Sequence, residues 1–158
     1  MRIAGLTKND TTNGEGICVS LWVQGCPHRC KGCHNPESWD FNGGEYINNW
    51  RLIEQISEAI TANGIQRNFS ILGGEPFAPQ NIDDTYQILW HIKERFPSIK
   101  TFVWTGYTLQ QLQDLYEDTL LDNVDVLIDG PFIKAERDIT LKFRGSKNQR
   151  ILYRGVDY

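Results

Sequence analysis

The sequence predicts an α/β fold, an incomplete TIM-like (βα) barrel with a mostly parallel sheet. Short apolar segments typical of buried strands alternate with amphipathic segments of helical period. The amphipathic segments are long enough to form the right-handed crossovers that join parallel strands. The chain has 158 residues, whereas a complete barrel of eight such units takes roughly 250. About four or five strands are therefore expected, in one domain.

The first part of the chain contains two predicted strands and a cysteine-rich loop. Residues 1–6 are compatible with a short strand, and residues 7–16 form a polar loop that contains glycine. Residues 17–24 are mostly apolar, as in strands buried inside an α/β sheet. The cysteine-rich segment, residues 25–35, directly follows this strand.

An irregular segment and a helix come next. Residues 36–46 contain Trp39 and Phe41, whose rings are expected to cap the cysteine loop against the core. From residue 49 the apolar period becomes helical, and Gly64 provides a left-handed stop. This helix is expected to cross back over the sheet.

The same unit then repeats. Residues 69–72 are predicted to form a strand that ends in Gly73-Gly74-Glu75-Pro76. The following helix is expected to begin at a capping pair, Asn81 and Asp84, and to end before Pro97.

A third unit follows. Residues 100–104 indicate a strand, and Thr105 begins a turn. Thr108 and Gln111 have the spacing of a capping box for the next helix. Residues 124–128 indicate a further strand.

Four unlike motifs follow the predicted strands: the cysteine loop, the Gly73–Pro76 motif, the turn at Thr105 and the Asp129-Gly130 pair. Parallel strands have their carboxyl ends at one edge of the sheet, which is where ligands bind in α/β folds. The sequence therefore predicts a site at this edge.

The cysteine loop has the chemistry of a metal site. Cys26, Cys30 and Cys33 are spaced C-x3-C-x2-C, so one turning loop can aim three sulfurs at a common point. A [4Fe-4S] cluster is ordinarily held by four thiolates, and three would leave one iron open to a substrate. Cys18, within an apolar strand, is expected to pack in the core.

Two other interpretations of the loop remain open. A zinc site of three cysteines with His28 or His34 is chemically allowed, although zinc sites usually pair two short clips far apart in sequence. A disulfide framework is less favoured, because a chain of this length does not need one and no secretory leader is visible. The open-site cluster is the favoured interpretation.

The cysteine spacing resembles the signature of the radical S-adenosylmethionine (SAM) superfamily, and the likeness covers nearly the whole chain. Residues 13–25 are similar to the approach strand of glycyl-radical enzyme activases, and Gly73–Pro76 matches the GGEP motif of the superfamily. Residues 126–132 and the segment R-G-S-K-N-Q-R at 144–150 resemble the smallest activase family, the activators of anaerobic ribonucleoside-triphosphate reductase.

This resemblance implies a single domain of radical SAM type over residues 1–158 and a radical SAM oxidoreductase that generates a glycyl radical. Cys26, Cys30 and Cys33 would ligate a [4Fe-4S] cluster whose fourth iron is open to SAM. Reductive cleavage of SAM would give a 5'-deoxyadenosyl radical, which would remove hydrogen from a glycine of the reductase. The implied partners are the large subunit of that reductase and an electron donor such as a flavodoxin.

The resemblance also implies which residues contact SAM. Gly32 stands where many members have an aromatic residue before the third cysteine, which leaves the adenine contact to His34 or to nearby backbone. The expected cofactor-binding residues are Gly32, Cys33, His34, Gly73, Gly74, Glu75, Pro76, Thr105 and Asp129.

Two other functions stay open as alternatives. One is a zinc-stabilised binding module without catalytic activity. The other is a radical SAM enzyme with a small-molecule or peptide substrate, which the short chain and the lack of further cysteine clusters disfavour.

Charge and hydropathy restrict the partners. The net charge of −4 and a pI near 5.3 argue against nucleic acid. Residues 134–154 nonetheless carry a net charge of +5, which indicates either a solvated segment or a surface for an acidic partner or ligand. The carboxylate that Arg144 or Arg150 would pair with could belong to SAM, to a partner or to this chain. No apolar run reaches about 18 residues and no leader is visible, so a cytoplasmic protein without membrane contact is expected.

Overall fold

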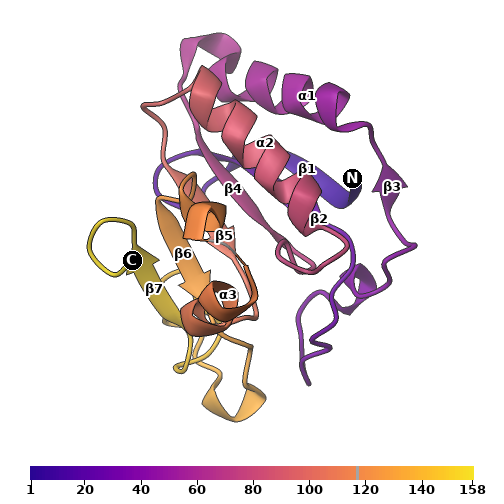
Figure 1. The fold of residues 1–158 in the computed structure, drawn as a ribbon, viewed down its shortest axis with the longest axis vertical. Helices are drawn as coiled ribbons and strands as arrows, with labels where there is room; N and C mark the ends of the chain where they lie inside the picture. Colours follow the sequence, from indigo (N-terminus) through magenta and orange to yellow (C-terminus); the bar gives the residue numbers. More distant parts are fainter. Residues whose placement is uncertain (117) are drawn as a thin grey trace.

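The computed structural model describes residues 1–116 and 118–158, and its strands form one open sheet (Figure 1). In chain order the elements are β1 (Arg2–Asp10), β2 (Cys18–Val23), η1 (Pro36–Ser38), β3 (Glu45–Tyr46), α1 (Asn49–Thr61), η2 (Ala62–Gly64), β4 (Asn68–Gly73), α2 (Ile82–Arg95), β5 (Thr101–Trp104), α3 (Leu109–Leu115), η3 (Asp118–Leu121), β6 (Val126–Asp129), η4 (Lys134–Glu136) and β7 (Arg150–Tyr153).

The sheet is mixed, with the strand order β3-β1-β2-β4-β5-β6-β7. Strands β2, β4, β5 and β6 are parallel neighbours. The edges are antiparallel, because β3 pairs with β1, β1 with β2, and β7 with β6. The predicted incomplete TIM-like barrel with a mostly parallel sheet is therefore wrong: the described strands form an open, mixed sheet. It has seven strands where about four or five were expected.

The lengths of the connections explain this difference. Only residues 11–17 join β1 to β2, which is too short for the crossover that a parallel pair requires. Residues 130–149, between β6 and β7, contain the short η4 turn but no α-helix. Each edge strand therefore returns antiparallel to its neighbour. Strand β1 also extends to Asp10, four residues beyond its predicted end.

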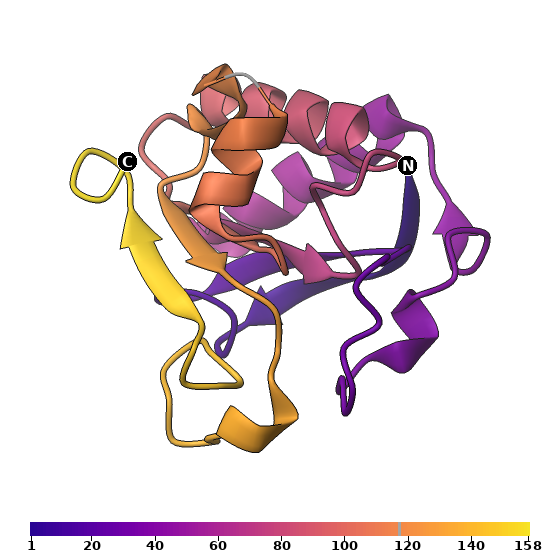
Figure 2. The same ribbon diagram turned by 60° about the horizontal axis from the view of Figure 1, so that its bottom comes forward.

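The predicted strand–helix units are confirmed. Helix α1 connects β2 to β4, α2 connects β4 to β5, and α3 connects β5 to β6. Figure 2 shows the three helices over one face of the sheet. The main core lies between these layers, where alternate strand residues such as Leu21, Phe69 and Ile71 pack with Ile56 and Ile88 of the helices.

Loops cover part of the opposite face. Phe102, Val126 and Ile128 form a second, smaller cluster there, with Phe143 of the connection between β6 and β7 packed against it. On the same face, Ser70 donates a hydrogen bond to the carbonyl of Asn13 at 2.6 Å. The connections that precede β2 and β7 therefore cover part of this face.

Two predicted helix starts differ in outcome. The capping box of Thr108 and Gln111 is confirmed at α3. The predicted capping pair of Asn81 and Asp84 is wrong, because the Asn81 side chain makes no capping bond at α2 and binds other loops instead. No helix in the part of the chain that the structure describes is long and apolar enough to span a bilayer.

Candidate functional site

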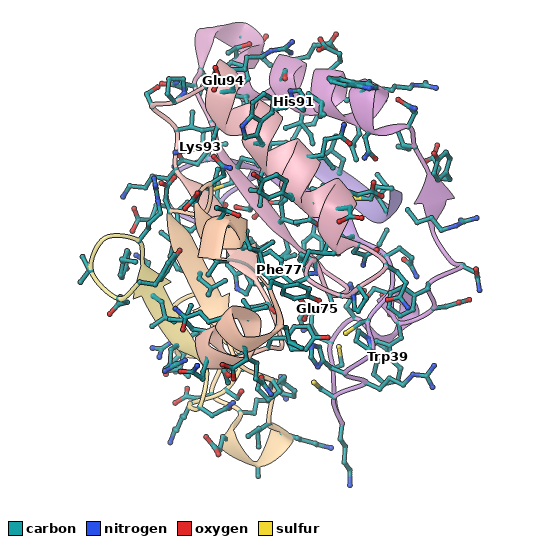
Figure 3. The ribbon with its side chains drawn as sticks, in the orientation of Figure 1. Trp39, Glu75, Phe77, His91, Lys93 and Glu94 are labelled. Carbon is teal, nitrogen blue, oxygen red and sulfur yellow. The ribbon has the colours of Figure 1, made fainter. Side chains whose placement is uncertain are left out.

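The structure brings the four motifs predicted from the sequence to one edge of the sheet. The parallel strands β2, β4, β5 and β6 end there, and the cysteine loop, the Gly73–Pro76 motif, the Thr105 turn and Asp129 follow them. Figure 3 shows Glu75 and Trp39 at this end of the molecule, below helix α2. The edge therefore gathers side chains from segments about 100 residues apart.

The cysteine loop contains three left-handed residues, the first of which is Gly25 with a φ of 93°. Arg29 has a φ of 47° and Gly32 a φ of 80°, and the N–H of Cys33 donates to the carbonyl of Cys30 at 3.0 Å. Its three cysteines are partly buried free thiols. The N–H of Asn35 points at the Cys33 sulfur, at 3.4 Å.

The surroundings of these cysteines act on the thiols in opposite directions, because burial favours the neutral thiol and nearby backbone N–H groups favour the thiolate. Burial raises the pKa of the Cys26 thiol to about 11, against the opposing effect of the backbone amides of His28 and Arg29. Backbone N–H groups thus face the sulfurs of two of the three cysteines, as they do around iron–sulfur clusters. The indole Nε1 of Trp39 is also buried without a hydrogen-bond partner.

A single-ion site is not preformed. Among residues 1–116 and 118–158, no group of three or more His, Cys, Asp or Glu side chains is arranged to hold one metal ion. A four-iron cluster is bound by separate thiolates at its corners, so the sulfurs of its ligands do not meet at one point. The donor set of the loop fits such a cluster.

The segment after the loop packs against its first residues, through the ring of Phe41, as predicted, and through the backbone of Trp39. A Cβ atom added to Gly25 would lie 2.1 Å from the Phe41 ring, so that ring rests directly on the Gly25 backbone. The N–H of Cys26 donates to the carbonyl of Trp39 at 3.1 Å. Residues 38–41 therefore hold the start of the cysteine loop.

Gly73 and Gly74 are glycines because β4 approaches the end of β2. Gly73 has a φ of 103°, and a Cβ atom on Gly74 would lie 2.5 Å from the Gly25 carbonyl oxygen. The N–H groups of Gly74 and Glu75 donate to the carbonyls of Val23 and Gly25, both at 2.8 Å. Lack of a Cβ thus permits a close contact within the chain.

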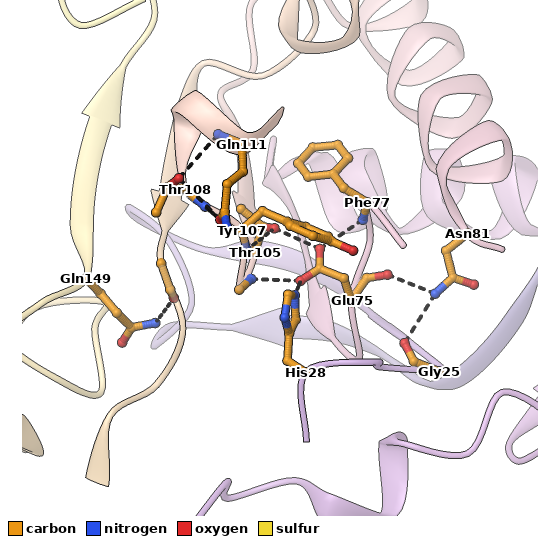
Figure 4. Close-up of polar contacts among 12 residues, drawn as sticks. Gly25, His28, Glu75, Phe77, Asn81, Thr105, Tyr107, Thr108, Gln111 and Gln149 are labelled. Atoms are coloured by element: carbon orange, nitrogen blue, oxygen red, sulfur yellow. Dashed lines mark hydrogen bonds and ion pairs between the residues drawn. The ribbon is translucent and has the colours of Figure 1, made fainter. Parts of the chain in front are cut away.

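The Glu75 carboxylate is the centre of a buried network (Figure 4). Its side chain is 1% exposed. One oxygen accepts from the Thr105 hydroxyl at 2.8 Å and the Phe77 N–H at 3.0 Å. The other accepts from the Gly106 N–H at 2.7 Å and from His28 Nε2 at 2.8 Å. Four donors use the lone-pair sites of the carboxylate, so Glu75 points into the protein.

Asp129 is also engaged within the chain. Its carboxylate is fully buried, receives the Arg150 guanidinium on both oxygens, and accepts from the Leu109 N–H at 2.8 Å. The bidentate partner of Arg150 is therefore a carboxylate of this chain. Arg154 likewise pairs with Asp125 at 3.0 Å, so part of the positive charge of residues 134–154 is neutralised internally.

The remaining predicted contact residues differ in exposure. Gly32 and His34 are exposed at the tip of the cysteine loop, Gly73 and Gly74 are partly exposed, and Pro76 is buried. The Thr105 hydroxyl donates its hydrogen bond to Glu75. The accessible candidates are thus in the loop and at the end of β4.

Comparison with known proteins identifies the family. Residues 12–152 match the family model of a 4Fe-4S single cluster domain. A Vibrio cholerae protein named anaerobic ribonucleoside-triphosphate reductase-activating protein is 37% identical over 142 residues, which cover 90% of this chain and 91% of the relative. The Haemophilus influenzae protein of that name is 38% identical, with 90% and 91% covered. The one from phage T4 is 34% identical, with 90% and 87% covered.

The chain belongs to the family of anaerobic ribonucleoside-triphosphate reductase-activating proteins. The region that matches the 4Fe-4S model begins in the connection before β2 and ends within β7. All four motifs at the sheet edge of this activating-protein family member therefore lie inside the matched region.

Sequence reasoning missed the role of two residues in this member of the activating-protein family. His28 was considered as an alternative zinc ligand, but its ring binds Glu75 and contacts the Tyr107 ring edge-on, with 4.6 Å between ring centroids. The Asn81 amide donates to the carbonyls of Gln24, Gly25 and Glu75. The position of His28 between two cysteines was an available signal, whereas Asn81 before a helix resembles an ordinary cap.

Proposed function

We propose that this chain activates an anaerobic ribonucleoside-triphosphate reductase by reductive cleavage of SAM at a [4Fe-4S] cluster. The observation that carries the proposal is a loop of three free thiols at the ligand-binding edge of a parallel strand set, in a chain whose relatives are named as activators of that reductase. The match to a 4Fe-4S single cluster domain supports the same chemistry.

Cys26, Cys30 and Cys33 would hold the cluster, and three protein ligands leave one iron for SAM. When bound, the cluster would supply one electron for the cleavage of SAM to methionine and a 5'-deoxyadenosyl radical. The protein binds and orients the reactants and excludes competing reactions. The Asn35 N–H stabilises negative charge on the Cys33 sulfur by donating to it.

Two segments would supply the SAM contacts. We assign them to Gly32, Cys33 and His34 of the cysteine loop and to the backbone of the Gly73–Pro76 motif. The side chains of Glu75, Thr105 and Asp129 already have partners within the chain. Glu75 and Thr105 contribute by holding these segments in position, whereas Asp129 binds Arg150 and the Leu109 N–H.

The substrate would be a glycine of the reductase large subunit, which loses a hydrogen atom. The described sheet is open, and an open edge admits a loop of another protein. An electron donor such as a flavodoxin would reduce the cluster. Exposed cations at Arg29, Lys31 and Lys134 give this end a charge that suits an acidic donor.

The test is to mix the reduced protein, SAM and the reductase without oxygen and to record the electron paramagnetic resonance spectrum. A glycyl radical signal is expected with the wild type and none with Cys30→Ala. SAM cleavage without a glycyl radical would remove the partner assignment. Full activation of the reductase by iron-free protein would also contradict the proposal that a cluster is required.

A further inference from the structure

We propose that His28 and Glu75 form a latch that fixes the cysteine loop to the ends of β4 and β5, so that Glu75 acts by positioning this loop and not by contacting SAM. The consequence for SAM binding rests on the proposed function. The latch itself rests on contacts within the chain.

The first contact is the hydrogen bond between His28 and Glu75. His28 lies between Cys26 and Cys30, and its side chain is 18% exposed, whereas that of Glu75 is 1% exposed. Nε2 of His28 lies 2.8 Å from the carboxylate. A carboxylate only accepts hydrogen bonds, so Nε2 carries the donated proton. Bonds to a charged acceptor are among the stronger hydrogen bonds in proteins.

The second contact is a niche for the imidazole ring. A Cβ atom on Gly106 would lie 2.4 Å from His28 Cδ2. Gly106 does not have a positive φ, so its backbone conformation does not require glycine. Glycine is needed here because a side chain would collide with the His28 ring. The Gly106 N–H donates to the same Glu75 oxygen that binds His28, and Tyr107 covers the ring edge. The turn after β5 is thus shaped around His28.

The third contact holds the start of the loop. The Asn81 amide donates to the carbonyls of Gly25, at 3.3 Å, and Glu75, at 2.9 Å. Cys26 therefore lies between two anchored residues of the loop. Gly25, before it, is bound by Asn81, and His28, after it, is bound to Glu75. The position of Cys26 relative to the Gly73–Pro76 motif is set by protein contacts.

Removal of His28 leaves three donors on Glu75, from Thr105, Phe77 and Gly106. The carboxylate stays paired, so His28→Ala is expected to fold and to loosen only the loop. Removal of Glu75 would instead leave several buried donors without an acceptor, which is more damaging. His28 and Gly106 are therefore the positions for the test.

The test is hydrogen–deuterium exchange of the full-length protein, purified without oxygen and loaded with its cluster, read out over residues 25–33. His28→Ala is expected to raise the exchange rate there about tenfold to a hundredfold, the range for losing a buried hydrogen bond to a charged group. Gly106→Ala, which displaces the ring, should do the same, and the double variant should add little. The matched control is His91→Ala on α2, whose ring contacts Trp50 and Trp90; it should leave this segment unchanged.

The second readout is SAM affinity, measured by equilibrium binding, together with iron content. The latch predicts that His28→Ala keeps its iron but binds SAM at least about tenfold more weakly, and that His28→Gln, which retains a donor, recovers part of the loss. Unchanged exchange in His28→Ala would overturn the latch, and unchanged SAM affinity with faster exchange would overturn its role in positioning. If the wild-type protein forms no glycyl radical on the reductase, the proposed function is wrong. The exchange experiment would still test the latch, because it does not depend on that function.

Discussion

The four cysteines differ in their surroundings. Cys18 is fully buried at the amino end of β2, where its thiol lies 3.6 Å from the carbonyl of Glu15 and burial raises its pKa. The three loop cysteines lie beyond the carboxyl end of the same strand. A strand of six residues spans roughly 20 Å, so Cys18 cannot join the other three in one cluster.

We therefore predict opposite results for two substitutions. Cys30→Ala should lose the cluster and all SAM cleavage, because one of three proposed protein ligands is gone. Cys18→Ala should keep both and lose about 1 kcal/mol of unfolding free energy, since it removes a small buried group. Iron and sulfide analysis of protein prepared without oxygen checks both. Loss of iron in a folded Cys18→Ala protein would refute the assignment.

At the scale of elements, the connection between β1 and β2 is organised by one carboxylate. Asp10 accepts from the N–H of Thr12 at 2.8 Å and from the Asn13 side chain at 2.7 Å. Asn13 in turn receives the Ser70 hydroxyl of β4 on its carbonyl. The short connection is thus tied to the strand beside β2, which favours the antiparallel return of the chain.

This carboxylate predicts a dependence of stability on pH. Burial alone would raise the pKa of Asp10, but hydrogen bonds from Asn13 and Thr12 outweigh it and lower the pKa to about 2. Because the folded pKa lies below the unfolded value, the stabilisation is present above about pH 4 and is lost as the pH falls towards 2. It amounts to about 2 kcal/mol.

Urea unfolding of the reduced, metal-free protein between pH 5 and pH 2 checks this. Asp10→Asn should be less stable at pH 5 and should show a loss in acid smaller by about that amount. Equal slopes for the two proteins would contradict the prediction.

Helix α3 depends on its first turn. It has only seven residues, too few for a stable isolated helix, and its capping box satisfies two backbone N–H groups. Thr108→Ala should therefore lower the unfolding free energy by about 1 kcal/mol, measured by urea denaturation at neutral pH. Gln110→Ala, an exposed change in the same helix, should cost less than about 0.5 kcal/mol. Equal losses would show that the cap is not the cause.

At the scale of the whole molecule, one large core joins the sheet to all three helices and one small cluster lies on the other face. The large core contains residues of every parallel strand. The small cluster has three buried members and secures the connection that leads to β7. The large core should therefore contribute more to the free energy of unfolding than the small cluster.

Two phenylalanine substitutions compare these faces. Phe69→Ala, in the fully buried centre of β4, should cost about 4 kcal/mol, because it removes a large side chain and leaves a cavity. Phe143→Ala, partly exposed beside the small cluster, should cost less than about 2 kcal/mol. Urea transitions followed by circular dichroism give both values. A larger loss for Phe143→Ala would reverse this order.

Sequence reasoning located most of the parallel part of the fold. The strand–helix units, the α3 capping box and the gathering of four motifs at one edge follow from period, turn chemistry and chain order, which act over a few residues. The segments at 126–132 and 144–150, also local, indicated the family to which the chain belongs. The barrel prediction failed because the orientation of edge strands depends on connections that carry no periodic signal.

The sequence by itself determined the parallel strands, the helices between them and the identity of the thiols, since each is specified by neighbouring residues, whereas the edge strands β3 and β7 were not predicted. Only the tertiary structure decided which side chains meet. His28 and Glu75 are 47 positions apart and Arg150 and Asp129 are 21 apart, so no local pattern predicts either pair. The pairing of parallel strands β2, β4 and β5 brings His28 and Glu75 to one edge, whereas the antiparallel register of β6 and β7 places Arg150 opposite Asp129.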